Sequence, residues 1–97
     1  MSSFDATMAT LRARFVARAA EDLLRLRGHQ SGMPLPRQDL HWLAHRLAGS
    51  AGLFGFDEVS LLAGELDDRL ASGGDATTLR ELLTALEGVV SENRSAD

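Results

Sequence analysis

Hydrophobic residues recur at three- and four-residue steps in four segments of the chain, and no segment alternates apolar and polar residues at period two. Such spacing places the apolar side chains on one face of an α-helix. The first segment predicts a helix of about six turns that ends at Gly28. Its expected apolar face consists of Phe4, Met8, Leu11, Phe15, Ala19, Leu23 and Leu26.

A loop is expected at residues 28–36, because this segment holds both prolines and two glycines. A second helix begins at Arg37 or Gln38 and ends at Gly55, with Asp39 in its first turn, where a carboxylate complements the helix dipole. Its expected apolar face consists of Leu40, Leu43, Ala44, Leu47, Ala51 and Phe54.

The remaining chain predicts two further helices. Asp57 is the expected N-cap of the third helix, which ends at Gly73. The fourth helix begins between Asp75 and Thr78, and Thr78 and Glu81 have the spacing of a capping box. The two apolar faces are Val59, Leu62, Ala63, Leu66 and Leu70, and then Leu79, Leu82, Leu83, Leu86 and Val90.

Four amphipathic helices with one longer loop and two short turns predict an all-α fold, an antiparallel four-helix bundle. The 97 residues are too few for a second domain or a large buried catalytic cleft, so we expect residues 1–97 to form a single domain. The initial methionine and the complete set of helices favour a stand-alone protein.

Charge and composition exclude several classes of function. The net charge is −4, and all ten cationic side chains are arginines scattered along the chain, which argues against nucleic acid as a partner. The longest uncharged stretch, residues 47–56, is too short to span a membrane. Because cysteine and a secretion signal are both absent, we expect a cytoplasmic protein. We also expect a monomer.

His45 is the candidate functional residue. At about 100° per residue it lies roughly 140° from Leu40 around the second helix, so it faces solvent. Glycine inside a helix costs about 1 kcal/mol relative to alanine, and two glycines follow His45 within two turns. They allow either the approach of a partner or tight packing of a neighbouring helix, or they begin an early end to the helix. The residues around His45 on this surface are Gln38, His41, Ala48, Gly49 and Gly52.

Two stretches of the chain carry a family resemblance: His45-Arg46-Leu47-Ala48-Gly49-Ser50-Ala51-Gly52-Leu53-Phe54-Gly55, followed by Leu62, and the later pair Leu66-Asp67. They resemble the signature of the histidine phosphotransfer (HPt) domain family. That signature reads His-x-Leu-Lys-Gly-Ser, then a glycine six residues after the first one, then a Leu-Glu pair on the next helix. The coincidence of an exposed histidine, both glycines and the apolar-acidic pair makes the resemblance specific.

The resemblance implies that His45 takes a phosphoryl group from a receiver-domain aspartate, or from a histidine kinase, and passes it to another receiver. The implied partners are receiver domains of response regulators or hybrid histidine kinases. The chain needs no cofactor of its own, since Mg²⁺ belongs to the receiver, and no nucleotide-binding loop supports autonomous kinase activity. The expected partner-binding residues are Gln38, His41, Trp42, Arg46, Ala48, Gly49 and Gly52.

Two positions of the resemblance bear on the chemistry. Asp67 occupies the place of the family's Glu, where a carboxylate can orient one imidazole nitrogen and leave the other free; a merely solvated acid is the alternative. Ala48 occupies the place of the family's Lys, whose ammonium attends the phosphoryl oxygens. Arg46 and Arg69 are the cations that remain to reach the phosphate, and neither is well aimed.

Other interpretations stay open. Trp42 is either an anchor of a docking surface or packs against the first helix or the loop at residues 34–36, and we favour packing. A degenerate member of the family would be a non-catalytic interaction module that docks a receiver or kinase without transferring phosphate. His41 and His45 have the spacing of metal ligands, but Asp67 is the only obvious third ligand, so we expect no metal site.

Overall fold

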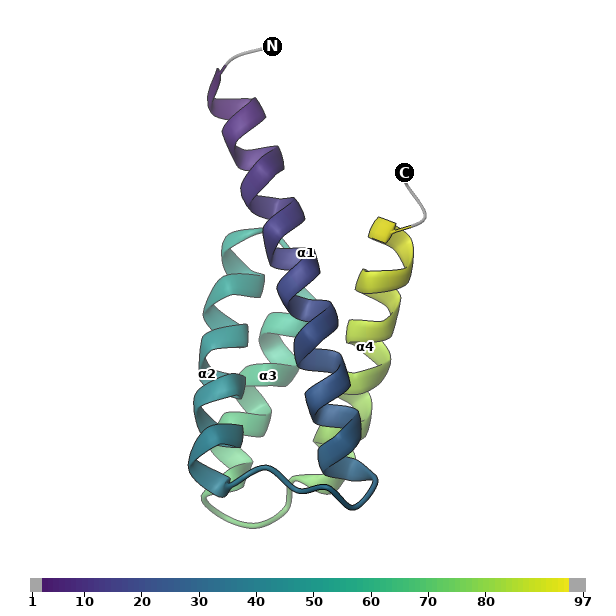
Figure 1. Ribbon diagram of the computed structural model, residues 1–97. Helices are drawn as coiled ribbons and strands as arrows, with labels where there is room; N and C mark the ends of the chain where they lie inside the picture. Colours follow the sequence, from purple (N-terminus) through teal and green to yellow (C-terminus); the bar gives the residue numbers. More distant parts are fainter. Residues whose placement is uncertain (1–2, 95–97) are drawn as a thin grey trace.

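The computed structural model describes residues 3–94, which form four α-helices joined by short connections. The helices are α1 (Ser3–Gln30), α2 (Arg37–Leu53), α3 (Asp57–Leu70) and α4 (Ala76–Arg94). Consecutive helices run antiparallel, and α1 packs against both α2 and α4, so the four helices close into a bundle (Figure 1). The predicted all-α four-helix bundle is confirmed.

Apolar side chains from all four helices meet in one core. Every residue expected on the apolar faces of α3 and α4 is buried, and so is the expected face of α2 apart from Phe54, which is partly buried. Burying one leucine side chain contributes roughly 1.5–3 kcal/mol, so the core leucines dominate the stability of the fold. The fully buried leucines are Leu26, Leu43, Leu47, Leu66, Leu82 and Leu86.

The first half of α1 departs from the prediction. Phe4 is 70% exposed and Leu11 is 38% exposed, although both were expected in the core. In Figure 1 the N-terminal turns of α1 extend beyond the ends of the other helices, so no neighbouring helix covers their apolar face. The helix also continues past Gly28 to Gln30, two residues further than predicted.

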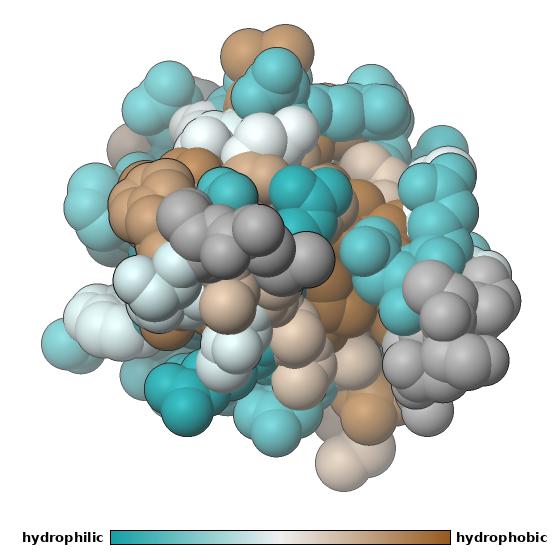
Figure 2. Space-filling view, turned by 90° about the horizontal axis from the view of Figure 1, so that it is seen from above, coloured by the Kyte–Doolittle hydropathy of each residue, from teal (hydrophilic) through white to brown (hydrophobic). Residues whose placement is uncertain are grey.

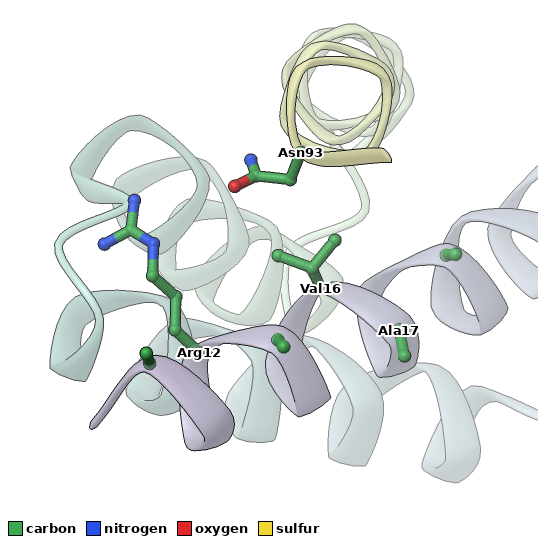
Figure 3. A pocket seen from close by; sticks show the side chains of 7 residues that line it. Arg12, Val16, Ala17 and Asn93 are labelled. Atoms are coloured by element: carbon green, nitrogen blue, oxygen red, sulfur yellow. The ribbon is translucent and has the colours of Figure 1, made fainter. Parts of the chain in front are cut away.

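A hollow of about 540 Å³ separates this half of α1 from the end of α4. Figure 3 shows Arg12 and Val16 of α1 facing Asn93 of α4 around it. Seen from this end, the molecule shows apolar surface between hydrophilic side chains (Figure 2). Arg12 ties α1 to the connection after α2, because its Nη1 donates to the Phe54 carbonyl at 2.9 Å and its guanidinium lies 4.4 Å from the Phe56 ring centroid.

Two helix caps differ from the prediction. Asp57 is the first residue of α3 rather than its N-cap, and Phe56 holds the cap position without a side-chain hydrogen bond. The helix α4 begins at Ala76, and the Leu79 amide donates to the Asp75 carbonyl, so Thr78 lies inside the first turn. The Thr78 side chain is buried there. Thr78 therefore does not cap α4, and the predicted capping box is wrong.

Candidate functional site

His45 lies in the middle of α2, on the face opposite the core. Leu40, Leu43 and Leu47 point inward and are buried, while the His45 side chain is 80% exposed. The helical periodicity therefore predicted its direction correctly. An imidazole in this position is open to a second macromolecule.

Asp67 of α3 lies directly beside His45. Because α3 runs antiparallel to α2 and packs closely on it, residues far apart in sequence meet across this pair of helices. His45 Nδ1 lies 3.3 Å from Asp67 Oδ2, and only 18% of the Asp67 side chain is exposed. When Nδ1 carries the proton and donates to the carboxylate, the lone pair of the ring is on Nε2. Among residues 3–94, Nε2 has no hydrogen-bond partner.

The same carboxylate contacts a second histidine. His41 Nδ1 lies 2.6 Å from Asp67 Oδ1, an ion-pair distance, although the angle is not that of a hydrogen bond and Oδ1 lacks a hydrogen-bond partner. His41 precedes His45 by four residues, so the two rings share one face of α2. From the sequence, these three residues were considered together only as possible metal ligands, and a metal site was not expected. Within the described chain, no group of three His, Cys, Asp or Glu residues is placed to hold a metal ion.

Arg46 is not available to a phosphoryl group on His45. Its Nη2 lies 2.7 Å from Oδ1 of Asp22, a residue of α1 that is only 1% exposed. Only one hydrogen bond joins the two side chains, because Arg46 Nε and Asp22 Oδ2 have no hydrogen-bond partner in the described chain. Sequence reasoning missed Asp22, although an acidic residue on the buried face of α1, three residues after Ala19, was the signal.

The surface around His45 is acidic. A shallow recess of about 460 Å³ lies beside the imidazole, and three carboxylates from α3, those of Glu65, Asp67 and Asp68, line it. In the part of the chain that the structure describes, no arginine contributes to this lining. Arg69 is turned toward Gly74 in the connection to α4, with Nη1 3.9 Å from where a Gly74 Cβ would lie. Neither arginine considered from the sequence replaces the lysine that is missing at Ala48.

The two glycines after His45 have different surroundings. A Cβ on Gly49 would meet nothing within 4 Å, so this position is open. A Cβ on Gly52 would lie 3.1 Å from Oγ of Ser60 in α3, and that hydroxyl donates to the Ala48 carbonyl at 2.7 Å. Gly52 therefore serves packing inside the bundle, whereas Gly49 leaves free space next to the histidine.

Trp42 and Gln38 complete this face of α2. Trp42 is 62% exposed, so the packing that we expected does not bury it, and its ring centroid lies 5.5 Å from the Arg46 guanidinium carbon. Gln38 is exposed and lines a second recess together with His41. The expected partner-binding residues thus share one helix, but Arg46 and Gly52 are engaged within the bundle.

Comparison with known protein families agrees with the fold. A family model described as Hpt domain matches residues 10–95. No curated protein and no solved structure gives a significant match. Within residues 3–94, none of the helices is long and apolar enough to cross a membrane.

Proposed function

Because the chain belongs to the Hpt domain family, which supports a role in phosphorelay, we propose that it carries a phosphoryl group on Nε2 of His45. The group comes from a receiver-domain aspartate or a histidine kinase and passes to another receiver domain. One observation carries the proposal: an imidazole that is 80% exposed has Nδ1 beside a carboxylate and Nε2 free. A structural histidine has no need of this arrangement.

The geometry suits nucleophilic attack by a neutral imidazole. The Nε2 lone pair attacks phosphorus, an N–P bond forms, and the bond from phosphorus to the aspartyl oxygen breaks, so the aspartate leaves as a carboxylate. The Nδ1 proton remains between the ring and Asp67, which offsets the positive charge that develops on the imidazole. Phosphoryl transfer depends mostly on positioning and charge neutralisation, and Mg²⁺ would come with the receiver.

The surface near His45 supports docking of a second protein. Gly49 has open space above it and Ala48 is small, so neither side chain would hold a partner away from the imidazole. Trp42 is 62% exposed on the same helix and offers an apolar anchor. The proposed contact residues are therefore Gln38, His41, Trp42, Ala48 and Gly49, without Arg46 and Gly52.

Incubation with a phosphorylated receiver domain tests the proposal. We expect acid-labile label on the chain and its loss in His45→Gln, with the helical circular dichroism unchanged because His45 packs against nothing in the core. His29→Gln is the matched control, since it removes a histidine in the last turn of α1, where Nδ1 accepts a hydrogen bond from the Leu35 amide at 3.0 Å, and leaves α2 unchanged. Docking without label would contradict the proposal and favour the degenerate interaction module, which the acidic lining without arginine keeps as a second candidate.

Ala48→Lys tests whether the missing cation limits the rate. The aliphatic stem of lysine can lie along the helix while the ammonium reaches water, and a cation at this position should speed labelling about two- to fivefold. Ala48→Met adds similar bulk without charge and should leave the rate unchanged. Equal rates for both variants would show that another group serves the phosphate.

A further inference from the structure

The phosphoryl site proposed above has an electrostatic problem. A phosphoryl group on Nε2 of His45 would carry negative charge next to the carboxylates of Glu65, Asp67 and Asp68. Ala48 supplies no charge, and Arg46 is bonded to Asp22 inside the bundle. Some other group of this chain or of its partner must compensate for the repulsion.

His41 is placed to do so. It lies one helical turn before His45 on the same face, and its Nδ1 contacts Asp67 Oδ1 at 2.6 Å while His45 contacts Oδ2. Because the two imidazoles use different oxygens, protonation of His41 leaves the contact of His45 with the carboxylate in place. The charged and titratable groups around His41 are Arg37 and His45 on α2 and Asp67 on α3.

We infer that His41 is a positioning residue whose protonated imidazole, through its ion pair with Asp67, supplies the positive charge that the phosphoryl site otherwise lacks. The inference rests on the proposed function of His45. A histidine in this role differs from a lysine in one measurable way, because histidine changes its charge between about pH 5 and pH 8. The site should therefore accept phosphate more readily at the acidic end of this range than a neutral residue at position 41 would allow.

The effect should be modest. The His41 ring is 59% exposed, so water and salt screen its interaction with a phosphoryl group one helical turn away. A single positive charge at this separation in a high dielectric corresponds to about a two- to fivefold change in rate. The change should shrink further at about 1 M salt, where the Debye length falls to about 3 Å.

Phosphoramidate is the probe for the test, because it labels histidine without any receiver. Nε2 of His45 attacks phosphorus of the phosphoramidate zwitterion, whose nitrogen already carries three protons, the P–N bond of the donor breaks, and neutral ammonia leaves. The rate of labelling is followed by intact mass spectrometry from about pH 5.5 to about pH 8.5 for the native chain, His41→Arg and His41→Gln. Labelling of His45→Gln gives the background, and His29→Gln is the control for loss of a histidine elsewhere.

The expected result is a crossover. His41→Arg should be labelled about two- to fivefold faster than His41→Gln at every pH, since arginine stays charged and glutamine stays neutral. The native chain should match His41→Arg at low pH and His41→Gln at high pH.

Where His45 is labelled, either of two results would overturn the inference. One is a ratio of native to His41→Gln rates that does not change with pH, and the other is a His41→Arg rate no greater than that of His41→Gln. A lack of any labelling at His45 would also overturn it, because there would be no phosphoryl group to stabilise. The crossover with phosphoramidate, combined with no transfer from receivers, would instead contradict the proposed function and leave the role of His41 intact.

Discussion

Two sides of α2 meet carboxylates from neighbouring helices in different ways. On one side Arg46 contacts Asp22 of α1 at 2.7 Å, and on the other side the adjacent residue His45 contacts Asp67 of α3 at 3.3 Å. Asp22 is 1% exposed, whereas 18% of the Asp67 side chain and 80% of the His45 side chain are exposed. Consecutive residues of one helix therefore take part in a buried contact and an exposed one.

The difference shows how burial and the type of cation separate structure from chemistry. Arginine stays protonated and lies largely inside the bundle, so its contact with Asp22 joins α1 to α2 permanently. Histidine changes charge near neutral pH and leaves one nitrogen free, so the contact with Asp67 can orient a nucleophile. Asp22 engages the arginine that follows His45 in sequence, and the other side chain in contact with Asp67 is a second histidine, His41.

The largest expected effect is a difference in stability between the alanine variants of the two aspartates. Asp22→Ala leaves the Arg46 guanidinium without its partner inside the bundle, and we expect a loss of about 2–4 kcal/mol in the free energy of unfolding. This lies toward the low end for a buried pair because 20% of the Arg46 side chain is exposed. Asp67→Ala should cost less than about 1 kcal/mol. Urea denaturation measures both, and equal losses would break the distinction between the two sides.

The next largest effect is a difference in the rate of phosphoryl transfer between the same two variants. Asp67→Ala removes the group that fixes the His45 tautomer, and we expect phosphoryl transfer to slow about tenfold, the size of effect typical of residues that orient a functional imidazole. Labelling from a phosphorylated receiver measures the rate. Asp22→Ala, assayed at a temperature where it is fully folded, should transfer at a rate close to that of the native chain. A tenfold loss in both variants would show that the Asp22 side also positions His45.

The smallest effect compares the two glycines of α2. Gly49→Ala adds a methyl group to open space and should raise the stability by about 1 kcal/mol through helix propensity. Gly52→Ala should gain little or nothing, because its Cβ would press on Ser60 Oγ at 3.1 Å and weaken the bond to the Ala48 carbonyl. Thermal or urea denaturation of the two variants should differ by about 1 kcal/mol. Equal stabilisation would contradict the packing role of Gly52.

Much of the bundle could be predicted from the sequence because helical periodicity is a local property. The apolar steps of α2, α3 and α4 identified their buried faces, and the direction of His45 followed from the same wheel. The pattern failed at Phe4 and Leu11, whose spacing is equally regular. Periodicity shows which face of a helix is apolar, but it does not show how far the neighbouring helices extend.

The residues of the candidate site and the contact of His45 with Asp67 were predictable, whereas the other contacts of the site were not. His45 and Asp67 were identified as a pair from the resemblance, and their atoms lie 3.3 Å apart. The ion pair of His41 with Asp67 and the pairing of Arg46 with Asp22 join residues 26 and 24 positions apart. Such contacts depend on the rotation and axial offset of packed helices, and the sequence pattern of one helix does not specify either quantity.

The sequence by itself determined four amphipathic helices, an exposed histidine on the second one and the absence of lysine beside it, because these properties follow from residue type and local spacing. Only the tertiary structure decided which charges meet. Packing of α1 on α2 buries Asp22 and engages Arg46, and packing of α3 on α2 places Asp67 between His41 and His45. Short-range Coulomb interactions depend on distances of a few ångströms, and those distances are set by how the helices pack.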